Sequence, residues 1–218
     1  MYLAIEGVIG VGKTTLARLL QPIFNTELLL EVFEENPFLS DFYADRERYA
    51  FQTQTFFLLS RYHQHHRFVP DVLVRNQSLI ADYTFEKDSL FARINLKGDE
   101  LKMYYRVHEA LAEKIPLPEL IIYLRAETDT LMQRIALRDR SYERNMERDY
   151  IAELNDAYEE FYSEHHSGAP VLTIDSGDLD YVRNSDHLKY VENRIRQSLR
   201  LPPFQTELPF ELAGELEA

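Results

Sequence analysis

A glycine-rich stretch near the N-terminus has the residue types of a phosphate-binding loop. Residues 7–14 read GVIGVGKT, which fits the pattern G-x-x-x-x-G-K-[ST], and they lie between an apolar run and a segment of helical period. Glycines let backbone amides curl around a phosphate, and the N-terminus of the following helix adds partial positive charge. Lys13 would bring a full charge to the β- and γ-phosphates, and Thr14 would offer a hydroxyl to Mg²⁺. The residues expected to contact a nucleoside triphosphate here are Gly7, Val8, Gly10, Val11, Gly12, Lys13, Thr14 and Thr15.

Acidic residues follow two apolar runs, at the places where open α/β sheets bind their ligands. Glu31 ends the run Leu-Leu-Leu-Glu, where its carboxylate could accept a proton from an acceptor hydroxyl. Glu34 and Glu35 follow closely as rival candidates, and a solvated loop acid is the simpler alternative. Asp82 follows the run Leu-Ile-Ala and is placed to hold Mg²⁺ through water, although it could equally cap a turn.

A basic segment follows later in the chain. Arg134 and Arg138 are four residues apart and share one helical face, and Arg140 comes next. Their planar guanidinium groups suit phosphate oxygens, so we expect a lid at about 138–148 that closes over the site and excludes water. The alternative is a salt-bridged surface helix, because acidic residues are interleaved with these arginines.

The elements that must position these residues alternate between short apolar runs and longer helical segments, which indicates an α/β fold with a parallel sheet. The expected strands are 2–5, 27–30, 79–81, 120–124 and 170–174, and the expected helices are 14–24, 46–68, 99–114, 128–138, 148–165 and 182–199. Pro70 is expected to stop the long helix. We expect one domain at 1–201 and an acidic C-terminal tail at 202–218.

Composition narrows the classes of partner. The 218 residues include no cysteine, which excludes disulfides, thiolate metal ligands and a thiol nucleophile. Lys and Arg number 24 against 37 Asp and Glu, a formal net charge of −13, which argues against a nucleic-acid polymer or a membrane surface as partner. No targeting segment is visible at the N-terminus, so a cytoplasmic location is the default expectation.

Several further landmarks occur in a fixed order along the chain. They are EVFEENPFL at 31–39, FY at 42–43, FQTQTFFLLSR at 51–61, IADY at 80–83, IIYL at 121–124 and RDRSYE at 138–143. Together with the glycine-rich loop they resemble the deoxyribonucleoside kinase family, and within it the bacterial deoxyguanosine/deoxyadenosine kinases, over about residues 1–175. The resemblance implies a P-loop kinase fold, with a five-stranded parallel sheet flanked by helices and an arginine-bearing lid.

The resemblance also implies roles for particular residues. Glu31 resembles the general base that takes the proton of the 5′-hydroxyl, and Tyr43 with Glu143 resembles the pair that holds the sugar 3′-hydroxyl. Gln54 resembles the glutamine that reads the base edge, with Gln52 as a weaker alternative, and Arg61 resembles the arginine near the base. The expected catalytic residues are Lys13, Glu31, Arg138 and Arg140; the expected substrate-binding residues are Glu31, Tyr43, Gln54, Phe57, Arg61, Asp82, Phe85 and Glu143. Arg134 and Arg138 are expected at ATP, and Thr14 and Asp82 at Mg²⁺.

One departure from the family pattern bears on the substrate. Many members carry an arginine directly after the acid of the third strand, whereas this chain reads Asp82-Tyr83-Thr84. The form without arginine resembles the deoxyguanosine kinase branch and favours deoxyguanosine, and it leaves open what positions Glu31. Deoxyadenosine or a broader deoxynucleoside range, a thymidylate-like monophosphate kinase and a non-catalytic nucleotide-binding subunit are the alternatives. A homodimer is implied by the resemblance alone.

Overall fold

The computed structural model describes residues 1–144, 146–163 and 168–202, except the side chain of Glu34. Its centre is a parallel sheet in the order β2-β3-β1-β4-β5, which confirms the expected five-stranded parallel sheet. The strands are β1 (Tyr2–Glu6), β2 (Thr26–Leu29), β3 (Ser78–Ala81), β4 (Leu120–Arg125) and β5 (Val171–Asp175). Because β1 lies between β3 and β4, the loop that follows it emerges at the middle of the sheet edge.

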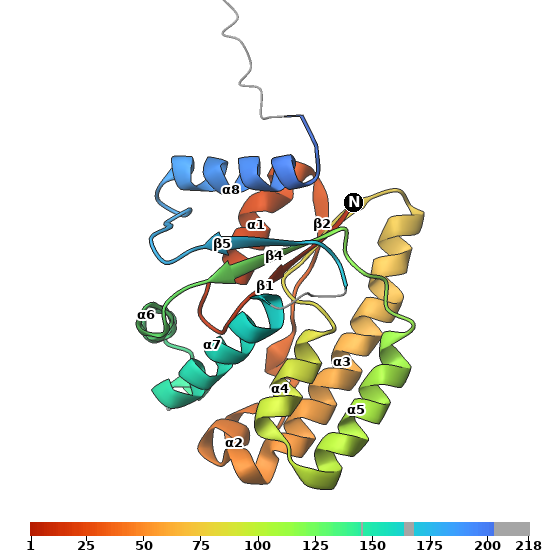
Figure 1. Ribbon diagram of the computed structural model, residues 1–218, viewed down its shortest axis with the longest axis vertical. Coiled ribbons are helices and arrows are strands. Elements are labelled where there is room, and N and C mark those ends of the chain that lie inside the picture. The colour runs from red at the N-terminus through yellow and green to blue at the C-terminus, as the bar shows by residue number, and fades with distance from the viewer. Residues whose placement is uncertain (145, 164–167, 203–218) are drawn as a thin grey trace, which may run out of the picture.

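Helices cover both faces of this sheet. They are α1 (Lys13–Phe24), α2 (Leu39–Ala44), α3 (Arg46–Val74), α4 (Lys87–Asn95), α5 (Gly98–Ala112), α6 (Thr128–Arg138), α7 (Arg148–Ser163) and α8 (Ser185–Ser198), with short 3₁₀ turns η1 (Phe33–Glu35) and η2 (Ser141–Glu143). Figure 1 shows α1 and α8 on one face, and α3, α4 and α7 on the other. In the described residues no helix is long and apolar enough to cross a membrane.

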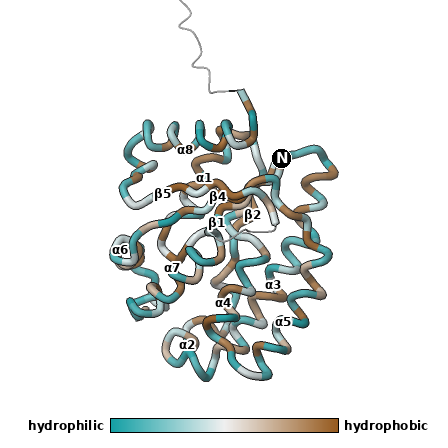
Figure 2. The backbone as a smooth tube through the Cα atoms, in the orientation of Figure 1, coloured by the Kyte–Doolittle hydropathy of each residue, from teal (hydrophilic) through white to brown (hydrophobic). Residues whose placement is uncertain are grey.

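The strands are apolar because both faces of the sheet are covered. In β1 and β3, residues such as Leu3, Ile5 and Ile80 are fully buried, as parallel sheets require. Figure 2 shows this as hydrophobic colour along the central strands, with hydrophilic colour on the outer turns of the helices. The buried strands therefore form a rigid support for the loops at their carboxyl ends.

The long helix does not stop at Pro70, so that expectation was wrong. Helix α3 continues through Pro70 to Val74, although proline removes one backbone hydrogen bond. Val69 and Val72 are fully buried in a cluster that includes residues of β3, and this packing outweighs the missing bond. The helix ends instead where Asn76 takes a left-handed conformation, with φ of 55°.

Sequence periodicity did not indicate α2 or α4, which are only 6 and 9 residues long. Such short segments carry too few turns for a periodic signal. The helix expected at 182–199 begins at Ser185. Of the expected tail, residues 203–218 lie outside the described residues, as do 164–165 of the helix expected at 148–165.

Candidate active site

The glycine-rich loop has the backbone that a phosphate cradle needs. Gly7 has φ of 142°, and a Cβ atom there would lie 2.3 Å from the backbone oxygen of Leu124, so only glycine fits. Lys13 lies inside the loop, where its Nζ donates to the backbone oxygens of Gly7 at 2.7 Å and Val8 at 3.0 Å. Burial, reinforced by the charge of Lys87, lowers the pKa of Lys13 to about 8. The loop thus holds a cationic group at the start of α1.

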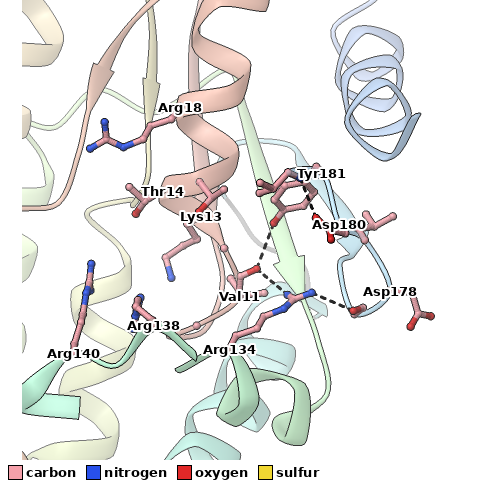
Figure 3. A pocket seen from close by; sticks show the side chains of 16 residues that line it. Val11, Lys13, Thr14, Arg18, Arg134, Arg138, Arg140, Asp178, Asp180 and Tyr181 are labelled. Carbon is pink, nitrogen blue, oxygen red and sulfur yellow. Dashed lines mark hydrogen bonds between the residues drawn. The ribbon is translucent and has the colours of Figure 1, made fainter. Parts of the chain in front are cut away.

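A cavity of about 710 Å³ opens at this loop. Figure 3 shows Lys13 and Thr14 on one side of it and Arg134, Arg138 and Arg140 on another. The expected residues that line it are Gly10, Val11, Gly12, Lys13, Thr14, Thr15, Arg134, Arg138 and Arg140. The loop after β5 lines it through Gly177, Asp178 and Leu179, and Arg18, Asp180, Tyr181 and Val182 line it without having been expected. Gly7 and Val8, which were expected at the nucleotide, do not line it. We name this space the donor cavity.

Arg134, which was expected at ATP, lines the donor cavity and is held there by backbone oxygens. Its guanidinium donates to the backbone oxygen of Val11 at 3.1 Å (Figure 3), and also to those of Ser176 at 2.7 Å and Gly177 at 3.1 Å. It therefore ties the glycine-rich loop to the loop after β5. A sequence does not show which backbone carbonyls an arginine will contact, so the sequence analysis could use only the spacing between Arg134 and Arg138.

A second, smaller cavity of about 100 Å³ lies beside the first, and we name it the acceptor cavity. Gly10, Lys13, Thr14, Arg138 and Arg140 line both cavities. The other residues around the acceptor cavity are Ile9, Glu31, Phe33, Leu39, Tyr43, Phe57, Arg61, Asp82, Lys87, Phe91, Tyr142 and Glu143. Six of the expected substrate residues therefore meet here: Glu31, Tyr43, Phe57, Arg61, Asp82 and Glu143.

Glu31 is the acid that the fold brings to the centre of the acceptor cavity. Arg61 donates to its Oε1 through Nε at 3.0 Å and through Nη2, and the Nζ of Lys87 lies 2.8 Å from Oε2. Burial alone would raise the pKa of Glu31, but the charges and hydrogen bonds of Arg61 and Lys87 outweigh it and hold that pKa well below its usual range. Glu31 is thus ionised at neutral pH. The rival Glu35 is exposed, and the side chain of Glu34 lies outside the described part.

Asp82 lies between Glu31 and the glycine-rich loop. Its Oδ2 accepts from the Thr14 hydroxyl at 2.5 Å, and its Oδ1 accepts from the backbone N–H of Glu31 at 2.8 Å. Burial raises the pKa of Asp82, although the hydrogen bond from Thr14 opposes this. The two oxygen groups expected at Mg²⁺ are therefore neighbours. Among the described residues there is no group of three or more His, Cys, Asp or Glu side chains that could hold a metal ion.

Glu6, which was not among the expected site residues, stabilises the positions of the phosphate loop and the segment after β3 through buried hydrogen bonds. It is fully buried, and its carboxylate accepts from the backbone N–H of Thr84 at 2.5 Å, from the Thr84 hydroxyl at 3.0 Å and from the Tyr158 hydroxyl at 3.2 Å. It also accepts from the backbone N–H of Gly7 at 3.2 Å. Glu6 thus joins the phosphate loop to the segment after β3 that carries Asp82.

Of the expected substrate residues, only Gln54 and Phe85 do not line the acceptor cavity. Tyr43 lines the acceptor cavity and stacks on Tyr142, and burial raises its pKa well above the usual range. Gln54 is buried on α3, two turns before Arg61, and its Oε1 has no hydrogen-bond partner among the described residues. Phe85 does not line the cavity, because its ring is stacked on His108 in the core.

The structure places a further acid, Asp88, in contact with Arg61. Asp88 is fully buried, its Oδ1 accepts from Nη1 of Arg61, and its Oδ2 has no hydrogen-bond partner in the described residues. Lys87 and Asp88 begin helix α4, which sequence periodicity missed. Charged residues at the start of a helix are usually exposed, so the sequence alone did not indicate that the side chains of Lys87 and Asp88 are buried.

A phosphate loop at the centre of a parallel sheet, with donor and acceptor cavities that share walls, defines the class of P-loop kinases. Comparison with known proteins narrows the class. The family model described as deoxynucleoside kinase matches residues 3–200, and the chain belongs to that family. Its activity is that of a deoxynucleoside kinase, and its fold is the P-loop kinase fold.

Individual relatives support this assignment. A deoxyguanosine kinase of Bacillus subtilis (strain 168) is 34% identical, over 90% of this chain and 96% of the relative. A deoxyadenosine kinase of Dictyostelium discoideum is 32% identical, over 93% of this chain and 84% of the relative. The structure of a deoxyadenosine kinase from M. mycoides with bound dATP superposes with a TM-score of 0.78 at 27% identity, covering 90% of this chain and 99% of that one.

Proposed function

We propose that this protein transfers the γ-phosphoryl group of ATP to the 5′-hydroxyl of a purine deoxyribonucleoside, with deoxyguanosine as the preferred acceptor. The observation that carries the proposal is the shared wall of the two cavities. Lys13, Thr14, Arg138 and Arg140 face both spaces, whereas Glu31 faces only the acceptor cavity. A phosphoryl group that leaves a donor on one side would meet a hydroxyl held on the other.

Glu31 would accept the hydrogen bond, and in the course of transfer the proton, of the 5′-hydroxyl. Its low pKa makes it a weak base, which suits a loose transition state in which the hydroxyl loses its proton late. Lys13, Arg138 and Arg140 would stabilise the charge on the transferred group, because all three lie where the cavities meet.

Mg²⁺ fits the oxygen groups that lie at this junction. The Thr14 hydroxyl and the Asp82 carboxylate are hard oxygen ligands that contact each other. Burial raises the pKa of Asp82, and the positive charge of a bound cation would oppose this by stabilising the ionised carboxylate. We therefore propose that Thr14 and Asp82 hold Mg²⁺, directly or through water. When bound, the ion would neutralise charge on the β- and γ-phosphates.

The preference for a purine, and for guanine among purines, rests on the relatives. A deoxyguanosine kinase is 34% identical to this chain and a deoxyadenosine kinase is 32% identical. Gln54 Oε1 and Asp88 Oδ2 are buried acceptors without hydrogen-bond partners among the described residues, but neither residue lines the acceptor cavity, so they do not discriminate between guanine and adenine.

Three further features belong to the proposal. Segment 138–148 would act as the lid, since Arg138 and Arg140 lie in it at the cavity junction, although residue 145 lies outside the described part.

A homodimer would form through helices, which agrees with the exposed apolar side chains of Leu59 on α3 and Met103 on α5. A cytoplasmic location would give access to ATP. Light scattering on the purified chain tests the dimer.

The test is a steady-state panel with ATP and Mg²⁺ against the four deoxynucleosides and their four monophosphates. We expect kcat/KM to be highest for deoxyguanosine, then deoxyadenosine, with no turnover of monophosphates. A higher kcat/KM for deoxyadenosine than for deoxyguanosine would contradict the proposed guanine preference, but it would agree with the proposed phosphoryl transfer to a nucleoside. Turnover of a monophosphate and of no nucleoside would contradict the reaction itself.

A further inference from the structure

The residue directly after Asp82 makes no hydrogen bond to Glu31; its ring lies beside Arg61, whose guanidinium carbon is 5.9 Å from the ring centroid. The Tyr83 side chain is fully buried, and its ring packs edge-on against His65 at a centroid distance of 4.8 Å. Its hydroxyl donates to Oε1 of Gln64. Tyr83 therefore belongs to the contact between β3 and α3, and the missing arginine at this position leaves no gap there.

Lys87, five residues after Asp82, is the next residue along the chain that lines the acceptor cavity. A tight turn, in which the backbone N–H of Asp88 donates to Phe85 at 3.2 Å and that of Ser89 donates to Glu86 at 3.0 Å, starts α4. Lys87 is the first residue of this helix, is only 5% exposed and lines the acceptor cavity. The turn thus aims a buried ammonium group at the carboxylate of Glu31.

The two cations hold the two carboxylate oxygens of Glu31 separately. Arg61 donates to Oε1, while Lys87 donates to Oε2 at 2.8 Å. Arg61 is also committed to Asp88, so it cannot follow Glu31 without breaking a second buried ion pair. Arg61 and Lys87 carry two positive charges and Glu31 and Asp88 two negative charges, so the group of four is neutral. Removing Lys87 would leave a buried negative charge and free one oxygen of Glu31.

We propose that Lys87 is a positioning residue for Glu31, which takes the part that an arginine directly after Asp82 would play in related chains. It fixes the rotation of the Glu31 carboxylate, so that the 5′-hydroxyl meets a defined oxygen lone pair. The inference rests on the proposed function, in which Glu31 receives that hydroxyl. Lys87 acts through Glu31 and does not itself need to contact the transferred phosphoryl group.

The experiment compares kcat and both KM values for the wild type, Lys87→Met, Lys87→Arg, Glu31→Gln and the double variant Glu31→Gln/Lys87→Met. Lys87→Met should lower kcat by about 10- to 100-fold, the range for losing one hydrogen bond to a charged group, while KM for ATP changes by less than about twofold. Lys87→Arg should recover most of the lost kcat. In the double variant kcat should match that of Glu31→Gln within about twofold, because Lys87 would have nothing left to position.

Two controls separate this role from a general effect on folding. Lys189→Met removes an exposed lysine whose Nζ lies 3.3 Å from Asp186 on the outer side of α8, and it should leave kcat unchanged. Thermal unfolding of every variant checks the fold, and Lys87→Ala, which also removes the donor to Glu31, replaces Lys87→Met if that variant does not fold.

The proposal is overturned if Lys87→Met, or Lys87→Ala in its place, keeps the wild-type kcat. It is also overturned if the losses from Lys87→Met and Glu31→Gln multiply. Wild-type enzyme that phosphorylates no nucleoside would instead contradict the proposed function, so the two failures are distinguishable.

Discussion

Arg138 donates to both carboxylate oxygens of Glu143, at 3.1 Å from Nε to Oε2 and 2.6 Å from Nη2 to Oε1. Glu143 lines the acceptor cavity, whereas Arg138 lines both cavities. The pair therefore connects the group expected at the sugar 3′-hydroxyl with a group expected at the donor phosphates. Occupancy of the acceptor cavity and the position of Arg138 should depend on each other.

The variant Glu143→Gln tests this connection. Loss of the charged partner should raise the KM for deoxyguanosine and lower kcat, with a total loss in kcat/KM of about 10- to 100-fold. The 2′,3′-dideoxynucleoside should be a poor substrate for the wild type, but the variant should discriminate against it less, because the 3′-hydroxyl has already lost its strongest partner. Undiminished discrimination would place Glu143 away from the 3′-hydroxyl. Asp139→Asn, which removes the exposed partner of Arg144, is the matched control and should change neither KM.

Replacement of Arg134 should weaken the donor cavity. Arg134→Leu removes the donors to Val11, Ser176 and Gly177, so KM for ATP should rise by about tenfold and the melting temperature should fall. The dissociation constant for the nucleoside should change little. Arg134→Lys should not restore KM, since an ammonium group cannot reach carbonyls from two loops in a planar fork.

The matched control for Arg134 is Arg93→Leu, which breaks an exposed ion pair with Glu160 and should leave KM for ATP unchanged. Full recovery of KM by Arg134→Lys would show that charge, and not the fork of hydrogen bonds, is what this position contributes.

Thr14 and Asp82 should determine the requirement for Mg²⁺. Chelation of the metal should abolish turnover, and Thr14→Ser, which keeps the hydroxyl, should remain active. Thr14→Val and Asp82→Asn should both raise the Mg²⁺ concentration needed for half-maximal rate. The measurement is a Mg²⁺ titration of kcat at fixed ATP. Equal half-maximal concentrations in Thr14→Val and the wild type would argue that this hydroxyl serves only to hold Asp82.

His65 should make stability depend on pH on the acid side. Burial and the charge of Arg61 lower its pKa to about 3. The unfolded chain binds a proton at this side chain near pH 6.5, whereas the folded chain does not until about pH 3, so the free energy of unfolding should fall as pH drops below 6.5, by up to about 1.4 kcal/mol per unit. His65→Gln should show a shallower slope between pH 6.5 and 4 in urea unfolding. Equal slopes would mean that His65 is protonated in the folded state.

The elements with long periodic or fully apolar segments were predictable from the sequence. Strands β1, β3 and β4 agree with expectation because burial on both faces of the sheet leaves a nearly unbroken apolar pattern. The edge strands β2 and β5 were indicated by shorter apolar runs, helix 128–138 by its periodicity, and the phosphate loop by its motif. Pro70 misled the prediction of the long helix, since local propensity cannot show that Val69 and Val72 are packed against the sheet.

The candidate site was predictable where a motif or a strand end fixes the position of a residue, as for Lys13, Glu31 and Asp82. It was not predictable where a side chain turns inward from a short helix, as for Lys87 and Asp88, or where its partners are backbone carbonyls, as for Arg134. Phe85 shows the opposite error, because an aromatic residue near an expected site is as readily part of the core.

The most direct test of the central claim is the kcat of Glu31→Gln with ATP, Mg²⁺ and deoxyguanosine, measured beside Glu35→Gln. Glu31 lies in the acceptor cavity between Arg61 and Lys87, whereas Glu35 is exposed. The account predicts a kcat lower by about 10²-fold or more for Glu31→Gln, the scale of general-base loss, and a near wild-type kcat for Glu35→Gln. A near wild-type kcat for Glu31→Gln, with loss of activity in Glu35→Gln or Glu34→Gln, would contradict it.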